Sequence, residues 1–341
     1  MTYLYSLAFW FFLGWATLAH GVCLDPQLKG VNLAGAEFGA QKLPGVLGRD
    51  YIYPTQAEMG YFRATGMNVI RLPIRWERIQ RQLYGRLDST ELAQINQVLG
   101  WARDLKLCVL LDIHNYASYH GQPLGTAAVP AIALENVWLR LAQSLPDHNS
   151  LAIGLMNEPA SMRPSHWLSL AQATVLALRR AGSRHLILVG SGRWSGAHEF
   201  DVRVDGPSAA EVFANFRDPL KRFAVELHQY ADANYSGSGS ICIDPGSLQS
   251  IMQTLANWSR QNRVRLFMGE FGVPNNPDCL IDLLTLLRGM EDKPVWLGWT
   301  YWAAGPWWGN YALSIQPGGG ISSSGGPPGA QLSVLRNFLK P

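Results

Sequence analysis

Two glutamates stand at the ends of apolar segments of the sequence. Glu158 lies near the end of AIGLMNEP, and Glu270 near the end of LFMGEFG. A carboxylate in such a place is shielded on its apolar side, and burying it without a partner is costly. Glycoside hydrolysis needs two such carboxyl groups, one protonated to donate to the leaving oxygen and one ionised to attack or to activate water. Two glutamates that face each other also push their pKa values apart, so one side-chain type supplies acid and base.

Further polar and aromatic side chains close other apolar segments in the same way. A glutamate there could simply be a member of a salt bridge, with Arg71 as its partner. The pair of glutamates together with two histidines, a tyrosine and a tryptophan favours catalysis instead. The candidate residues beside the glutamates are Arg71, His114, Asn115, Asn157, His228, Tyr230 and Trp302.

Histidines and carboxylates could also bind a metal ion. Metal-dependent barrel hydrolases typically carry His-x-His on their first strand, whereas the first apolar segment here reads VNLAG. No CxxC or CxxH pair supports a zinc site. A serine nucleophile is not supported either, because the serine of GRWSG stands one place later than in GxSxG. We therefore expect no metal and no cofactor.

Short apolar segments alternate with longer amphipathic ones along the chain. The helical patterns open with Ser, Thr or Pro and end near Gly or basic residues, as capped helices do. Continuous apolar strands between helices indicate a parallel sheet covered on both faces, and eight units close into a (β/α)8 TIM barrel of the α/β class. An open doubly wound sheet is the alternative, but no GxGxxG follows the first segment. The predicted strands are 28–34, 68–74, 108–114, 150–157, 185–191, 223–229, 265–270 and 294–301.

A barrel also suits the size and composition of the chain. Its 341 residues are 48% hydrophobic and 16% charged, which excludes disorder and coiled coil. The 28 basic residues nearly balance the 25 acidic ones, and no long basic run occurs, so we expect no nucleic-acid partner. The segment 316–330, QPGGGISSSGGPPGA, is interpreted as a long last loop before a final helix.

The N-terminal segment is almost entirely apolar from Leu4 to Ala19. It is shorter than the roughly 20 residues that span a bilayer, and it is typical of a secretory signal peptide cleaved near Gly21. We thus predict a signal peptide over 1–21 and one catalytic domain over 22–341. An uncleaved anchor or a misassigned start stays open, because the segment lacks a basic residue. The expected mature protein is a secreted monomer, extracellular or periplasmic, that is free of the membrane once the leader is cleaved.

Disulfides are permitted in an exported protein, and the chain has four cysteines. Cys108 opens a strongly apolar segment, so we expect a buried free thiol there. Cys242 and Cys279 both lie in polar loops and are candidates for a bridge.

Five ordered motifs together resemble glycoside hydrolase family 5, the retaining clan of barrel cellulases. The resemblance runs from about Lys29 to the final helix. It is greatest to the fungal and bacterial endo-β-1,4-glucanases, and it implies cleavage of β-glucan by double displacement, with the two carboxyl groups about 5 to 5.5 Å apart. The motifs are RLPIRW at 71–76, DIHNYA at 112–117, MNEP at 156–159, HQY at 228–230 and GEFG at 269–272.

The resemblance assigns roles to the residues at the predicted bond-cleaving centre. It implies that Glu158 is the acid/base and Glu270 the nucleophile. Asn157 would bind the sugar 2-hydroxyl, and Arg71 and Tyr230 would hold Glu270 ionised and oriented.

The same resemblance extends to sugar-binding residues. His114 and His228 would bind sugar hydroxyls or tune the acid. Trp302 would form the stacking floor beneath the sugar at the cleaved bond, and Trp194 a platform on the leaving-group side.

In these relatives a disulfide links the loop after the sixth strand to the region after the seventh, which implies a Cys242–Cys279 bridge.

The loops PWWGNY and NYASYHG would select the polymer, so mannan, xylan or mixed-linkage glucan stay open as substrates. A non-catalytic carbohydrate-binding barrel is the rival from another class. It would be marked by a lost glutamate, and both glutamates are present.

The chain is rich in tryptophan, with 13 residues. Those within helical patterns are expected to pack in the core or shell, whereas Trp76 could pack or face the ligand. We expect one of Trp307 and Trp308 to contact substrate. The tryptophans expected to pack are Trp101, Trp138, Trp167 and Trp258.

Overall fold

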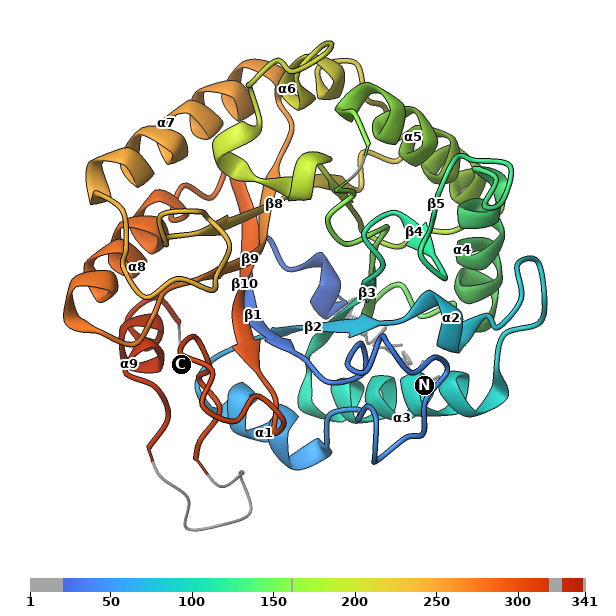
Figure 1. Cartoon of the computed structure of the whole chain (residues 1–341), viewed down its shortest axis with the longest axis horizontal. Coiled ribbons are helices and arrows are strands. Elements are labelled where there is room, and N and C mark those ends of the chain that lie inside the picture. The colour runs from blue at the N-terminus through green and yellow to red at the C-terminus, as the bar shows by residue number, and fades with distance from the viewer. Residues whose placement is uncertain (1–20, 161, 319–326, 340–341) are drawn as a thin grey trace, which may run out of the picture.

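The computed structural model describes residues 21–160, 162–318 and 327–339. Eight parallel strands close into a barrel in the order β1-β10-β9-β8-β7-β6-β3-β2 (Figure 1). The predicted (β/α)8 fold is therefore confirmed, with each strand inside or within a few residues of its predicted range. The strands are β1 (Leu28–Leu33), β2 (Val69–Ile74), β3 (Cys108–Ile113), β6 (Leu151–Gly154), β7 (Ile187–Gly190), β8 (Phe223–Tyr230), β9 (Leu266–Gly272) and β10 (Trp296–Ala304).

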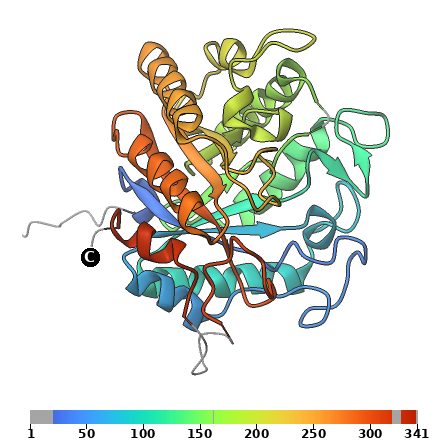
Figure 2. The same ribbon diagram turned by 60° about the vertical axis from the view of Figure 1, so that its left-hand side comes forward.

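Helices surround the barrel and cover the outer face of its sheet (Figure 1). Several begin at side chains that accept hydrogen bonds from the first turn: Asp88 caps α3, Asp244 caps α7 and Asn276 caps α8. The last three helices, α7, α8 and α9, pack side by side (orange to red in Figure 2). The helices are α1 (Gln56–Ala64), α2 (Trp76–Ile79), α3 (Ser89–Leu105), α4 (Ile132–Ser144), α5 (Pro164–Arg180), α6 (Ala209–Phe213), α7 (Pro245–Asn262), α8 (Pro277–Gly289) and α9 (Gln331–Arg336).

Three short 3₁₀ turns and one hairpin complete the elements. The turns are η1 (Val22–Leu24), η2 (Arg193–Ser195) and η3 (Ala197–Glu199), and the hairpin joins β4 (Ser118–Tyr119) to β5 (Gln122–Pro123). The expected final helix follows the Gly- and Pro-rich segment as α9. The part of that segment from 319 to 326 lies outside the described residues.

The barrel interior changes character from one end to the other. Alternate residues of a strand point to the same face, and on β3 this face carries Cys108, Leu110 and Asp112 in turn. The first two belong to a separate apolar cluster with Leu28, Ala224 and other strand residues. The interior is therefore apolar at the N-terminal ends of the strands and charged at their C-terminal ends, where barrel active sites form.

All four cysteines are paired. The structure joins Cys242 to Cys279, the predicted pair, with an S–S distance of 2.03 Å. The prediction of a free thiol at Cys108 is wrong, because Cys108 is bonded to Cys23 with a Cα–Cα distance of 4.9 Å. Turn η1 lies against the start of β3, where the Cys23 amide donates to the Asn149 carbonyl (2.9 Å). The apolar context of Cys108 indicated burial but not that the N-terminal segment reaches this end of the barrel.

The predicted signal peptide falls on residues 1–20, outside the described residues, with Gly21 as the first described position. Among the helices of the described ranges, none is long and apolar enough to cross a membrane. The division into a leader and a domain from residue 22 stays a prediction.

The two bridges predict a specific labelling pattern. Alkylation of the denatured, unreduced protein should label no cysteine, whereas alkylation after reduction should label all four. Loss of the Cys23–Cys108 bridge, which closes a loop of 85 residues, should lower the free energy of unfolding by about 2 to 5 kcal/mol. Peptide mapping and urea unfolding of Cys23→Ser measure both effects. Labelling of Cys108 before reduction would contradict this pairing.

Candidate active site

The charged end of the barrel interior is built from side chains of six strands and of the residues that follow β3 and β6. They lie at the alternating positions that face the barrel axis, or directly after a strand, so the closed sheet brings together residues far apart in the chain. All are buried except Glu158, which is half-buried. The residues are Asn32 on β1, Arg71 on β2, Asp112 on β3, His114 directly after β3, Asn157 and Glu158 after β6, Glu226, His228 and Tyr230 on β8, Glu270 on β9 and Trp302 on β10.

Arg71 is the centre of this group and is fully buried. Its Nη1 donates to Glu270 Oε1 (2.8 Å) and to Asn32 Oδ1 (2.9 Å), and its Nη2 donates to Asn157 Oδ1 (2.8 Å). The other oxygen of Glu270, Oε2, accepts from the Tyr230 hydroxyl (2.6 Å). Glu270 is thus held by one cation and one neutral donor, which is the arrangement that an ionised, fixed carboxylate requires.

Arg71 also faces two carboxylates that lie deeper in the barrel. Its Nη2 is 3.2 Å from Asp112 Oδ2, and its Nε is 3.0 Å from Glu226 Oε1. Burial alone would lower the pKa of Arg71, but Asp112, Glu226 and Glu270 outweigh burial and raise it above the ordinary value. The guanidinium is therefore a permanent charge around which the carboxylates are arranged.

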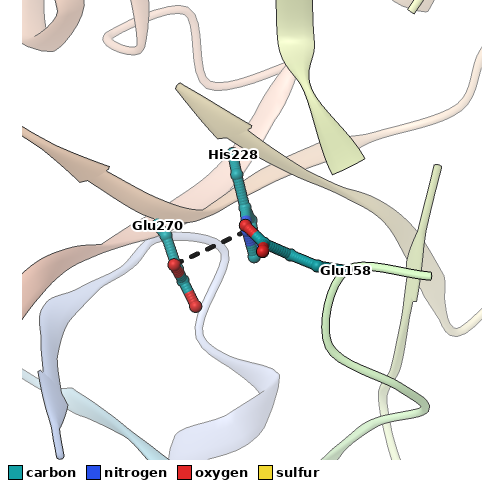
Figure 3. Close-up of side chains that lie close together, drawn as sticks. All are labelled: Glu158, His228 and Glu270. Atoms are coloured by element: carbon teal, nitrogen blue, oxygen red, sulfur yellow. Dashed lines mark hydrogen bonds and ion pairs between the residues drawn. The ribbon is translucent and has the colours of Figure 1, made fainter. Parts of the chain in front are cut away.

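Glu158 has a different neighbour from Glu270. Its Oε1 is joined to His228 Nδ1 by a hydrogen bond of 2.7 Å, and the side chains of Glu158 and Glu270 lie on either side of His228 (Figure 3). Burial raises the pKa of Glu158, against the opposing effect of His228. One glutamate is thus bound by a guanidinium and a hydroxyl, and the other keeps a raised pKa. That is the division expected of a nucleophile and an acid.

The spacing of the two glutamates fits a retaining enzyme. Carboxylate oxygens of Glu158 and Glu270 approach within 4.8 Å of each other, with His228 Nδ1 inside the same limit. Retaining glycosidases hold their carboxyl groups about 5 to 5.5 Å apart, and inverting ones about 6.5 to 9.5 Å. The approach found here is shorter than the separation that inverting enzymes need to place a water molecule.

The two histidines differ in charge, although both lie near the C-terminal ends of strands. Carboxylates around His228 raise its pKa to about 10, overcoming the opposite effect of burial, so His228 is a cation at neutral pH. Burial lowers the pKa of His114 well below its usual value, so His114 is neutral. The His114 Nδ1 is bonded to Asp112 Oδ2 (2.9 Å), and its ring stacks on Trp302 with centroids 5.7 Å apart.

Three candidate ligand atoms within 4.8 Å of one another, on Glu158, His228 and Glu270, raise the question of a metal ion. In the described part of the chain this is the one such group found. His228 Nδ1 already bonds Glu158, and Arg71 places a positive charge 2.8 Å from Glu270. A cation there would have to displace the proton between His228 and Glu158 and would face a guanidinium, so these three side chains suit a hydrogen-bonded cluster better than a metal site.

Trp302 and Trp194 lie on different parts of the cleft. Trp302 is buried among Tyr230, Trp308 and other residues. Trp194 is 57% exposed and lines a cavity of about 650 Å³ that also includes Glu158, His228 and Tyr230. The cleft therefore has one buried aromatic side chain, Trp302, inside the barrel and one exposed aromatic side chain, Trp194, at its opening.

The backbone that carries Trp194 is strained. Arg193, Trp194 and Ser195 have φ values of 45°, 59° and 55°, a left-handed run without glycine. Each such residue costs roughly 1 to 2 kcal/mol. An ion pair between Arg193 and Glu199 spans the turn. Strain of this kind persists where the surrounding structure fixes it, and here its effect is to present the indole to the cavity.

Some residues noted in the sequence do not take part in the site. Asn115 accepts from the Trp76 amide (2.9 Å) and donates to Glu77 (2.8 Å), so it stabilises the start of α2. Trp76 is buried, and its Nε1 donates to Gln80. Both residues are therefore structural.

The tryptophans expected to pack do so. Trp138 and Trp167 are buried and donate to the carbonyls of Leu155 and Gly190, and the half-buried Trp101 and Trp258 lie against the core. Trp308 contacts Trp302 edge-on, whereas Trp307 is 38% exposed. Whether one of these two touches substrate stays a prediction.

The sequence reasoning missed Asn32, Asp112 and Glu226. Asp112 lies two residues before His114, and Glu226 lies two residues before His228, so each shares a strand face with a histidine that was noted. The period of two along a strand is the signal that could have found these two residues. Asn32 lies within an apolar run and has no such neighbour.

The chain is similar to known glycosidases. The family model for cellulase (glycosyl hydrolase family 5) matches residues 26–306. A probable endo-β-1,4-glucanase B of Aspergillus oryzae is 30% identical over 92% of this chain and 90% of that protein. Among solved structures, XacCel5A in complex with cellopentaose has a TM-score of 0.88 and 41% identity, covering 92% of this chain and 99% of that one. The endoglucanase Cel5A of Pseudomonas stutzeri with cellobiose has a TM-score of 0.82 and 33% identity, covering 92% of each chain.

The charge cluster predicts a pH-dependent stability defect. Arg71→Met leaves three buried carboxylates without their cation. The free energy of unfolding at pH 7 should therefore be about 3 to 5 kcal/mol lower than in the unaltered protein. In the variant these carboxyl groups have raised pKa values when folded, so the folded state binds more protons than the unfolded one. The defect should therefore shrink as pH falls from 7 to 5.

Arg78→Met is the matched control. Arg78 is equally buried but donates to the carbonyls of Ala36, Phe38 and Pro44. Its defect should change little over the same range, because carbonyls do not titrate. Urea unfolding of both variants at several pH values measures the difference. Equal pH dependence in the two variants would contradict the interpretation of Arg71.

Proposed function

The chain belongs to the cellulases of glycosyl hydrolase family 5, and we propose that Glu158 and Glu270 carry the two displacement steps of its reaction. It is an endo-β-1,4-glucanase that acts with retention, and its substrate is a β-glucan. The observation that carries the assignment is the unequal setting of the two carboxyl groups. Glu270 is bound by Arg71 and Tyr230, whereas Glu158 is bound by His228 alone and has a raised pKa.

In the first step Glu270 Oε attacks the anomeric carbon of the sugar. The bond to the leaving oxygen breaks as Glu158 gives that oxygen its proton, and a glycosyl ester forms on Glu270. Arg71 and Tyr230 keep Glu270 ionised before attack. Because both donors act on a buried carboxylate, they require no rearrangement of water at the moment of reaction.

In the second step Glu158, now ionised, takes a proton from a water molecule. The hydroxide attacks the same carbon, the ester bond breaks, and Glu270 leaves as a carboxylate while Glu158 is again protonated. His228 lies beside Glu158 throughout, and its positive charge stabilises the ionised form that this step needs. Two inversions return the original configuration.

Asn157 supports the assignment of the sugar site. Arg71 fixes its Oδ1, which leaves Nδ2 as a buried donor without a partner among the described residues. A buried unsatisfied donor is costly. A sugar hydroxyl placed over Glu270 would accept from it, and we assign the 2-hydroxyl to this contact.

The aromatic residues divide the cleft into two sides. We propose that Trp302 is the floor beneath the sugar at the cleaved bond and that His114 supports it from behind. Trp194 and the cavity beside Glu158 would hold the leaving-group sugar, because the proton donor must face the departing oxygen.

Export is also proposed. Two disulfides are typical of proteins that fold in an oxidising compartment. Secretion, the monomeric state and the absence of a membrane anchor after cleavage stay predictions.

Azide products distinguish the roles of the two glutamates. Both Glu158→Gln and Glu270→Ala should lose 10²-fold or more of the activity on carboxymethylcellulose. With an activated aryl β-cellobioside, azide should rescue Glu270→Ala to the α-azide and Glu158→Ala to the β-azide, because only the second still forms the glycosyl ester.

Glu291→Gln, a substitution at a half-exposed salt bridge, is the control and should keep full activity. Mannan, xylan and mixed-linkage glucan are assayed beside carboxymethylcellulose to rank the polymers. Cellulase activity that survives Glu270→Ala, or azide products of exchanged configuration, would reject the assignment.

The platform role of Trp194 predicts a loss that depends on substrate. Trp194→Ala should lower kcat/KM on cellopentaose about tenfold, the loss of roughly 1.4 kcal/mol of stacking. An aryl cellobioside without a sugar on the leaving side should be cleaved as before. Tyr84→Ala, which removes an exposed aromatic outside the cavity, is the control. Equal losses on both substrates would show that Trp194 does not act on the leaving side.

A further inference from the structure

A third glutamate lies beneath the two assigned to catalysis. Glu226 stands on β8 two residues before His228, so both side chains point into the barrel. It is 1% exposed, and neither of its oxygens makes a hydrogen bond among the described residues. Its charged neighbours are Arg71 Nε at 3.0 Å and His228 Nε2 at 3.6 Å.

The space that Glu226 occupies is made by a glycine. A Cβ on Gly269, the residue directly before Glu270, would overlap Glu226 Oε1 and crowd its Cγ and Cδ. Any other residue at 269 would therefore displace the buried carboxylate. The strand that carries Glu270 thus leaves room for a second carboxylate next to it.

His228 lies between carboxylates on both ring nitrogens. Its Nδ1 contacts Glu158 (2.7 Å) and is 3.6 Å from Glu270, while its Nε2 faces Glu226. A ring with an anion on each side is held in one orientation and favours a proton on each nitrogen. With a proton on both nitrogens, Nδ1 can only donate to Glu158.

We propose that Glu226 is a positioning residue, which acts through His228 by keeping both ring nitrogens protonated and the Nδ1–H directed at Glu158. Through this contact it sets the pH above which the acid loses its proton. The inference rests on the proposed role of Glu158 as acid/base. It concerns a residue that touches neither the sugar nor the reacting atoms.

The charges around Glu226 and His228 support this role. Burial alone would raise the pKa of Glu226, but Arg71 and His228 lower it below its usual value, so Glu226 is ionised. Neighbouring β7 brings no titratable side chain to the pair. The other titratable groups that face it are Arg71 from β2, Asp112 and His114 from β3, Glu158 after β6, Tyr230 from β8 and Glu270 from β9.

These groups bring charges of both signs close together. Arg71 and His228 are cations, and Glu226 is an anion beside both. Burial raises the pKa of Glu158, and it raises the pKa of Asp112 to about 7. Removal of the Glu226 charge makes this cluster more positive, and added positive charge makes nearby protons leave at lower pH.

The direction of the effect on catalysis follows. The active enzyme carries protons on both Glu158 and His228, so the alkaline limb of kcat/KM reports loss of the first proton from this pair. Glu226→Gln removes a negative charge next to the pair and keeps the shape of the side chain. The alkaline limb should move to lower pH by about one unit, with KM nearly unchanged at the acidic side of the profile.

Asp112→Asn is the comparison variant, and the two alkaline limbs are compared above pH 7, where Asp112 also carries its charge. Asp112 also contacts Arg71, at 3.2 Å, but its second partner is His114 rather than His228. Its alkaline limb should move less than half as far as that of Glu226→Gln. Equal shifts would overturn the proposal, because the total charge around Arg71 would then set the limb. An unmoved limb in Glu226→Gln would overturn it as well.

A measurement on the unaltered protein tests the same point without a variant that must fold. Nitrogen NMR of histidine rings distinguishes doubly protonated from neutral imidazole. His228 should stay doubly protonated from pH 6 to 8, and His114 should be neutral throughout. A neutral His228 at pH 7 would reject the proposal. This readout does not use activity, so it stands apart from the azide experiment that tests Glu158 and Glu270.

Discussion

A buried guanidinium with more carboxylates than it can neutralise is the constraint on which this active site depends. Arg71 is fully enclosed and within 3.2 Å of Glu270, Asp112 and Glu226. Taking such a charge from water costs several kcal/mol, which is recovered only if its partners are placed closely and hydrogen-bonded. The partners come from different strands, so they can be placed only when the barrel is closed. Barrel closure therefore compensates the cost of burying Arg71 and, at the same time, sets the geometry of the catalytic pair.

The excess of carboxylates explains why the two histidines have different charges. His228 faces three glutamates and is a cation, whereas His114 has one aspartate and the indole of Trp302 beside it and is neutral. Both follow apolar strand residues in the sequence, and nothing local separates them. Their difference arises from which strands lie opposite, and so from barrel closure. The same closure gives Glu158 and Glu270 unequal surroundings and hence separate chemical roles.

Features that depend on local sequence patterns could be predicted, and features that depend on contacts between distant segments could not. The eight strands were predicted correctly, because apolar runs and helix caps are local signals. The Cys23–Cys108 bridge was missed because it depends on where a separate segment lies, and an apolar neighbourhood is equally compatible with a free thiol. Asp112 and Glu226 were missed for another reason. Their strands read as continuous apolar runs, and in a barrel the inward face can carry charge near one end while the outward face stays apolar.

The location of substrate choice follows from the contrast between the barrel and its loops. The charged cluster is buried and compact, so under the proposed roles any β-linked glycan that presents a pyranose ring would meet the same Arg71, Asn157 and Glu270. Discrimination among polymers would need contacts farther along the chain of sugars, for which the proposal offers loops such as the strained turn that holds Trp194. A left-handed run without glycine is maintained only if the Arg193–Glu199 pair and the surrounding packing fix it. Loop residues of this kind can change without disturbing the charge balance of the barrel, because their contacts do not reach Arg71. Chemistry and polymer preference are therefore separable in this fold, with the first set by strand closure and the second by the loops above it.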